Sequence, residues 1–128
     1  MDVLDEAGMI DAVEGAHFQL KNGATFDRGG ARAEFDFSDK FSLGWSTTYE
    51  VQRDRFDKLL ADQASEMGVA IHYCCEITGC DLTSEQPVLS YFDADRNRGQ
   101  LSSKFCLDAS GFGQTLANLL GMVRPAEW

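Results

Sequence analysis

The feature that most constrains this chain is an abrupt change of hydrophobic period at Gly68. Before it, apolar residues recur at helical spacing, which predicts an amphipathic helix that Asp54 caps at its start. These residues are Phe56, Leu59, Leu60, Ala64 and Met67. After it, apolar residues alternate over 69–77, which predicts a strand with one buried face. A long helix followed directly by strands indicates an α+β fold.

The polar stretch 93–99 separates two further apolar runs, 87–92 and 101–107. We expect these runs to form a hairpin, so that the long central helix is followed by a β-meander. The segment Asp108-Ala109-Ser110-Gly111 ends the last strand, and a short helix over 116–120 follows it.

In the first half of the chain, the apolar pattern predicts a helix over residues 3–16 that is broken at Gly8. Two or three strands are expected to follow between Phe18 and Gln52. Turn signals within this β-rich stretch lie at Asn22-Gly23, Gly29-Gly30 and 42–44. Phe35 and Phe37 alternate with polar residues, and we expect them to share a buried face.

Composition excludes several kinds of partner. The 128 residues carry 11 basic and 21 acidic side chains, and a net charge of −10 disfavours nucleic acid and anionic lipid. No apolar run is long enough to span a membrane, and the N-terminus does not resemble a secretory signal, so we expect a cytoplasmic protein with reduced cysteines. The spacing of the histidines and cysteines predicts no metal site.

Three motifs in a fixed order carry a resemblance to a known family. They are Tyr-Glu-Val-Gln-Arg-Asp-Arg-Phe-Asp-Lys-Leu-Leu at 49–60, Gly68-Val69 with Glu76-Ile77, and Leu-Asp-Ala-Ser-Gly at 107–111. In this order and spacing they resemble the middle of FAD-dependent monooxygenases, geranylgeranyl reductase-like enzymes and flavin-dependent halogenases. The stretch 18–26 and Trp45 also resemble substrate-domain strands of the halogenase-like branch.

The resemblance implies a fragment of an α/β FAD-binding fold together with substrate-domain β-strands. Residues 1–17 would form a crossover segment, 18–52 the substrate-domain strands, and 53–128 the second part of the FAD-binding domain. The family's Gly-x-Gly-x-x-Gly turn, which binds the FAD pyrophosphate, does not occur in these residues. We therefore expect a central fragment that is inactive alone and binds FAD weakly or not at all.

Arg53 matches the family position that contacts FAD near its diphosphate and ribityl portion. A guanidinium at a helix N-terminus suits phosphate oxygens, which makes this role physically reasonable. The alternative is a surface salt bridge to Asp54, Asp57 or Glu50, and the sequence leaves both interpretations open.

Two further segments match cofactor-binding positions of the family. The strand residues Glu76 and Ile77 would lie against the adenine, where backbone matters more than side-chain identity. The turn formed by Asp108, Ala109, Ser110 and Gly111 would pack closely against the flavin nucleotide. In both cases the alternative is a purely structural role, in which these residues form an ordinary strand or turn and contact no cofactor.

Lys21 is the candidate catalytic residue, because halogenases of this superfamily use a lysine near the substrate tunnel to hold or relay hypohalous acid. The alternative is a solvated lysine beside the Asn22-Gly23 turn. The resemblance as a whole implies an FAD-dependent oxidoreductase that acts on a small organic substrate. Alternatives are a non-catalytic module that self-associates into homo-oligomers and a reductase of the geranylgeranyl type.

Overall fold

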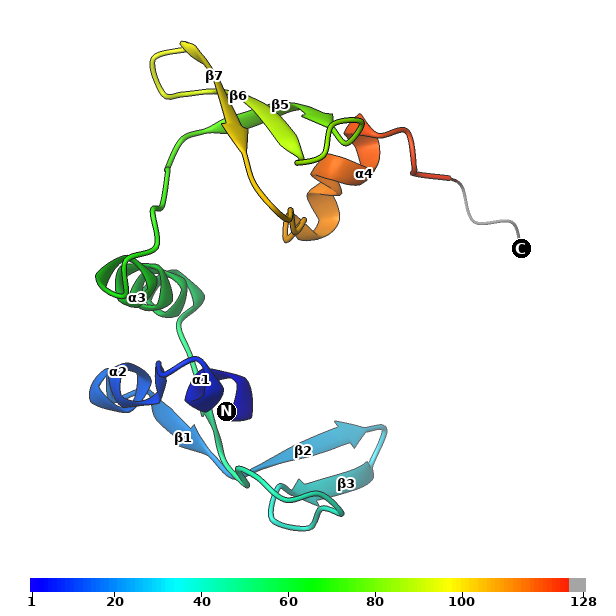
Figure 1. The fold of residues 1–128 in the computed structure, drawn as a ribbon. Coiled ribbons are helices and arrows are strands. Elements are labelled where there is room, and N and C mark those ends of the chain that lie inside the picture. Colours follow the sequence, from blue (N-terminus) through cyan, green and yellow to red (C-terminus); the bar gives the residue numbers. More distant parts are fainter. Residues whose placement is uncertain (125–128) are drawn as a thin grey trace. The chain divides into compact units, whose positions relative to one another are not determined.

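The computed structural model describes residues 1–124, and the chain divides into two compact units, Met1–Ile71 and a second that begins at His72 (Figure 1). Both units combine short helices with antiparallel sheets, which confirms the mixed α+β class. Within the described part of the chain, no helix is long and apolar enough to cross a membrane.

The first unit opens with the broken helix that the sequence predicts: α1 covers Asp2–Glu6 and α2 covers Ile10–Gly15, with Gly8 between them at φ +68°. Only glycine adopts this left-handed conformation readily, so the chain changes direction there. Helix α2 packs against the long helix α3, Arg53–Glu66, and Val13 is fully buried.

Helix α3 starts one residue earlier than Asp54, so the prediction of an Asp54 cap was wrong. Gln52 is the N-cap residue and its side chain makes no capping hydrogen bond, while Asp54 lies in the first turn. The start is stabilised by packing, because the Phe56 ring meets the Phe18 ring edge to face at 5.9 Å. The helix ends at Glu66, and the predicted stop signal, Gly68, follows the C-cap residue Met67 with φ +94°.

The first unit contains two separate two-stranded sheets. Strand β1, Gln19–Lys21, pairs antiparallel with β4, Thr48–Glu50, whereas β2, Gly23–Arg28, pairs with β3, Ala31–Asp36. The predicted hairpin turn at Gly29-Gly30 is present.

The Asn22-Gly23 turn is not a hairpin turn, because β1 and β2 do not pair with each other. The Asn22 carbonyl instead accepts a hydrogen bond from the Phe37 amide at 2.9 Å, which extends the β2–β3 ladder by one step. The dipeptide therefore carries the chain from one sheet into the next.

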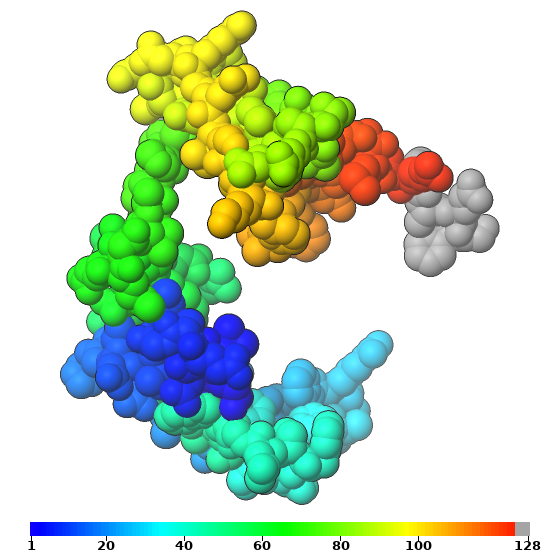
Figure 2. All heavy atoms as spheres, in the orientation of Figure 1, coloured from blue at the N-terminus to red at the C-terminus, as the bar shows by residue number. Residues whose placement is uncertain are grey.

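The expected burial of Phe35 was also wrong. Its ring forms an edge-to-face pair with Phe26 at 5.8 Å, yet the two residues are 59% and 62% exposed. Figure 2 shows the β2–β3 hairpin, light blue to cyan, projecting from its unit. The aromatic face of this hairpin is therefore accessible.

The second unit is built on the predicted β-meander, with the strands in the antiparallel order β5, Glu76–Asp81, β6, Val88–Phe92, and β7, Arg98–Ser102 (Figure 1). The prediction of a strand from residue 69 was wrong, because residues 69–75 pair with no strand and Cys74 has φ +55°. A strand is stable only where its backbone groups find a ladder partner.

The end of the meander also differs from the expectation of a strand over 101–107. Strand β7 ends at Ser102, and the chain then runs without regular structure to a 3₁₀ turn, η1, at Gly111–Gly113. The predicted final helix is present as α4, Thr115–Leu119, and it contacts β5.

The hairpin between β6 and β7 is held by Asp93, whose Oδ1 accepts hydrogen bonds from the amides of Asp95 and Asn97 at 2.9 and 2.8 Å. Beyond this turn, the Tyr91 ring lies over Gly99. A Cβ at position 99 would sit 2.4 Å from the nearest ring carbon, so glycine fits under the ring as it stands and any other residue would displace it.

Candidate functional site

The N-terminus of α3 presents Arg53 to solvent. Because Gln52 provides no side-chain cap, the first amides of this 14-residue helix keep their partial positive charge unopposed by a capping oxygen. The Arg53 guanidinium lies 3.0 Å from a carboxylate oxygen of Asp57 and is 78% exposed. Of the three acidic partners considered from sequence, Asp57 is the one that the structure pairs with Arg53.

The Asp-Ala-Ser-Gly turn forms a second cluster, in which side chains are directed at α4. Asp108 accepts hydrogen bonds from the amides of Ser110 and Leu116, both at 2.9 Å, and the Ser110 hydroxyl accepts one from the Thr115 amide at 2.8 Å. These groups satisfy amides in the first turn of α4 that no helical carbonyl can reach. The same contacts lower the pKa of Asp108, with the hydrogen bonds from the Ser110 hydroxyl and amide as the largest causes.

Since the Asp108 and Ser110 side chains are engaged with α4, a ligand at this turn would meet mainly backbone. Gly111 has φ +60°, and a Cβ placed there would meet no atom of the structure within 4 Å. The turn therefore leaves room at Gly111 for close approach of a ligand.

Glu76 and Ile77 open strand β5, where they pair with Phe92 and Tyr91 of β6. The Glu76 carboxylate forms an ion pair with Arg96 at 2.7 Å. The sequence does not indicate the Arg96 contact, because it depends on strand register and on the left-handed backbone of Arg96, φ +63°.

Lys21 lies at the end of β1 and is half-exposed. Its ammonium forms an ion pair with Glu50 of the neighbouring strand β4 at 3.3 Å. The side chain is therefore held by Glu50, in contrast to a freely solvated lysine. Its catalytic role stays a prediction.

The predicted residues fall into the two units. Arg53 and Lys21 belong to the first unit, whereas the β5 pair and the Asp-Ala-Ser-Gly turn belong to the second. The assignment of residue ranges to FAD-binding and substrate domains stays a prediction.

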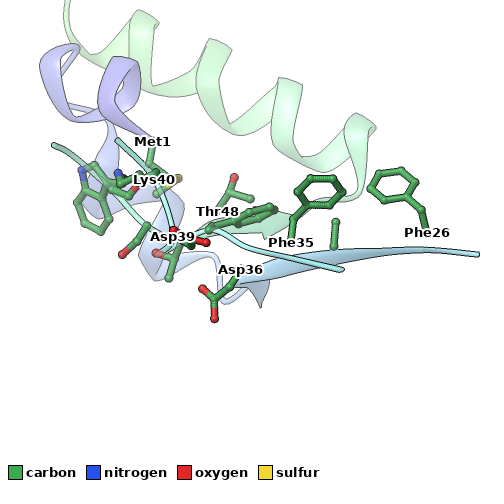
Figure 3. A pocket seen from close by; sticks show the side chains of 12 residues that line it. Met1, Phe26, Phe35, Asp36, Asp39, Lys40 and Thr48 are labelled. Atoms are coloured by element: carbon green, nitrogen blue, oxygen red, sulfur yellow. Dashed lines mark hydrogen bonds between the residues drawn. The ribbon is translucent and has the colours of Figure 1, made fainter. Parts of the chain in front are cut away.

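The first unit also has a pocket of about 670 Å³ over the aromatic face of the β2–β3 hairpin, which the sequence did not predict (Figure 3). Phe26, Phe35 and Phe37 line it from the hairpin and the residue after it, and Trp45 lines it from the loop that follows. The signal available in the sequence was the alternation of aromatic residues, which we interpreted as a buried face.

Comparison with known proteins places these features in a family context. No family model matches the chain. A crystal structure of a flavoprotein/dehydrogenase from Cytophaga hutchinsonii matches the whole chain at 40% identity with a TM-score of 0.91. The flavin-dependent halogenase CmlS matches 94% of the chain at 28% identity with a TM-score of 0.83. A tryptophan 2-halogenase from Chondromyces crocatus is 32% identical over 111 residues, 85% of the chain.

The relatives and structural neighbours of this chain are flavin-dependent halogenases and flavoproteins, so it matches a segment of the FAD-dependent oxidoreductase and halogenase superfamily. The chain spans only part of these proteins: 21% of the tryptophan 2-halogenase, 22% of CmlS and 32% of the Cytophaga flavoprotein. Two observations fit a flavin nucleotide: the exposed guanidinium of Arg53 at an uncapped helix start, and the open backbone at Gly111.

Proposed function

We propose that this chain is a segment of an FAD-dependent oxidoreductase of the halogenase or monooxygenase type, acting on a small organic substrate. The observation that supports this most directly is its match to the tryptophan 2-halogenase along 85% of its length. In such an enzyme the flavin would supply the redox chemistry with dioxygen, and the protein would supply binding, position and electrostatics.

In this proposal each predicted residue has a defined task. Arg53 binds the FAD diphosphate, the backbone of Ala109–Gly111 packs against the flavin nucleotide, and the strand formed by Glu76 and Ile77 supports the adenine. Asp108 positions the turn through its two amide contacts. Lys21, paired with Glu50, acts on the substrate side. Residues 1–17 and 53–128 then contribute to FAD binding, and 18–52 to the substrate domain.

A chimera tests the proposal. The 128 residues would replace the matched 32% of the Cytophaga flavoprotein, which has the same local fold. We expect the chimera to copurify with FAD, measured by absorbance and by flavin fluorescence after denaturation. A chimera that folds by circular dichroism and retains no flavin would contradict the proposal. The 128-residue chain alone is expected to purify without bound FAD.

Two opposite substitutions in this chimera separate the roles of Arg53. Arg53→Gln is expected to weaken FAD binding about 10-fold or more, because a charge-assisted contact to the diphosphate is lost. Asp57→Asn is expected to leave binding equal or tighter, since it releases the guanidinium from its ion pair. Affinity is measured by quenching of flavin fluorescence. If both variants bind FAD like the parent chimera, Arg53 serves only the surface ion pair.

A second candidate function is a non-catalytic module that self-associates, and the exposed surface favours it. The chain exposes 10602 Å². Two separate bodies of half its mass would expose about 8,100 Å² by the usual scaling of area with mass. The exposed side chains include large apolar ones such as Phe41, Leu43 and Phe112. Light scattering at increasing protein concentration is therefore expected to show dimers or larger species. A monomer at all concentrations would rule this candidate out.

A further inference from the structure

The chain has three asparagines, and their surroundings differ. The side-chain amide of Asn97 donates to Asp93 Oδ2 at 3.1 Å, and that of Asn118 donates to the Gly113 carbonyl at 3.0 Å. The third, Asn22, is exposed, and its side-chain amide makes no hydrogen bond within the part of the chain that the structure describes. Asn22 is therefore the asparagine whose side chain is free to rotate.

Asn22 also has space around it. It lines a hollow of about 380 Å³ on the β2–β3 hairpin, together with Gly23, Thr25 and Asp36. The residue that follows it is a glycine, so no neighbouring side chain stands between the amide carbon of Asn22 and the next backbone nitrogen. The side chain can therefore turn its amide carbon toward that nitrogen.

The backbone nitrogen of Gly23 lies outside the strand ladder. Pairs in an antiparallel ladder alternate between those that exchange hydrogen bonds and those that do not. The Phe37 amide donates to the Asn22 carbonyl at 2.9 Å, so the next pair, Gly23 with Asp36, is a pair without such bonds. The N–H of Gly23 therefore points away from β3, and β1 does not pair with β2 on the other side.

We propose that Asn22 is a site of spontaneous deamidation in the folded chain. The Gly23 nitrogen loses its proton and attacks Cγ of Asn22, the N–Cγ bond forms, the Cγ–Nδ2 bond breaks, and ammonia leaves. Water then opens the resulting succinimide at either of its carbonyls and gives aspartate or isoaspartate at position 22. Water is the only co-reactant, and nothing is oxidised or reduced.

The isoaspartate product changes the backbone beside Lys21. Its main chain runs through the former side chain and gains one carbon atom at the joint between β1 and β2. The carbonyl of residue 22, which accepts the Phe37 amide, becomes part of a free carboxylate. The lengthened joint cannot keep both pairings in register, so β1 is uncoupled from the β2–β3 hairpin.

Both products also place a new negative charge next to Lys21, whose ammonium lies 3.3 Å from Glu50. The new carboxylate competes with Glu50 for this ammonium. The modification uses no residue assigned to FAD and is independent of the proposed function. Its effect on catalysis, in contrast, rests on the role proposed for Lys21.

Incubation of the 128-residue chain at mildly alkaline pH, with and without urea, tests the site. Deamidation raises the mass by about 1 Da, and chymotryptic cleavage after Leu20 and Phe26 separates Asn22 from the other asparagines. We expect folding to slow the reaction of Asn97 and Asn118 at least about 10-fold, because their amides must first leave a hydrogen bond. Asn22 should react at a comparable rate in the folded and the unfolded chain. Protection of Asn22 by folding as strong as that of the other two would overturn the proposal.

Two variants separate the new charge from the added backbone atom. Asn22→Asp carries the charge on an unaltered backbone, whereas Asn22→Gln keeps an amide that would have to close a larger ring and is the unreactive control. After ageing, amide NMR should show shifted signals in β1 and β2 for the isoaspartate chain. The shifts should be smaller in Asn22→Asp, and aged Asn22→Gln should match its fresh sample. An isoaspartate chain with unshifted signals in both strands would show that β1 is not uncoupled.

Discussion

Replacing Gly23 with alanine is expected to open the start of the β2–β3 hairpin and to lower the free energy of unfolding by about 2 kcal/mol. A Cβ at this position would lie 2.5 Å from the Phe35 carbonyl oxygen on the opposite strand. Because that oxygen belongs to the backbone, it cannot rotate away, and the strands must separate. The change also disturbs the aromatic pocket, which Ala24 and Phe35 line.

Urea unfolding followed by circular dichroism measures this loss, and amide NMR shows where it occurs. Gly15→Ala is the matched control, since a Cβ at the end of α2 meets nothing within 4 Å and its backbone is not left-handed. This control should be as stable as the parent chain or slightly more so. A Gly23→Ala chain with unchanged stability would show that the register around Gly23 differs from the one described.

The second large effect is expected at Asp108. Asp108→Ala removes the acceptor for the amides of Ser110 and Leu116 and leaves the first turn of α4 without these bonds. We expect the melting temperature to fall by roughly 5 °C, as for the loss of a helix cap. Thermal unfolding at pH 7 measures it, and Asp95→Asn on the exposed β6–β7 turn is the control. An unchanged melting temperature would contradict this role.

The pH dependence of this effect has a definite sign. The pKa of Asp108 is lowered in the folded chain from an ordinary value of 3.8. Ionised Asp108 therefore contributes its stability above that ordinary value, and the contribution is lost as pH falls through the lower, folded pKa. The difference between the parent chain and Asp108→Asn should be largest near neutrality and should shrink in strong acid. A difference that grows in acid would refute the assignment.

The elements that the sequence predicted well are those specified by local patterns. The apolar stripe of α3, its stop at Gly68 and the polar turn before β7 each depend on residues within a few positions of one another. Turn and helix-end chemistry is local, so such signals can be interpreted without knowledge of the fold.

The wrong expectations concern the pairing of strands, which joins residues that lie far apart in the sequence. Residues 69–75 have the alternation of a strand and find no ladder partner, and Asn22-Gly23 has the composition of a hairpin turn between strands that do not pair. Strand β1 instead pairs with β4, which follows it only after the whole β2–β3 hairpin. Alternation indicates that a strand is possible, and only a partner makes it form.

The same distinction between local signals and long-range contacts applies to the candidate site. Arg53 and the Asp-Ala-Ser-Gly turn could be proposed as site residues because their motifs are contiguous in the sequence. The contacts that hold Trp45 join it to Asp2 and Asp5, about forty positions away, and no local pattern connects them. Pockets built from such distant contacts become apparent only in three dimensions.

The contact between Tyr91 and Gly99 bears on how sequences of this superfamily can diverge. A side chain at position 99 would require the ring to move, so a substitution there is easiest where position 91 has already changed to a smaller residue. The order of mutation is therefore constrained, and the two positions should covary in an alignment of relatives. Lineages that keep the tyrosine should keep the glycine, whereas those that have lost the ring should vary freely at position 99.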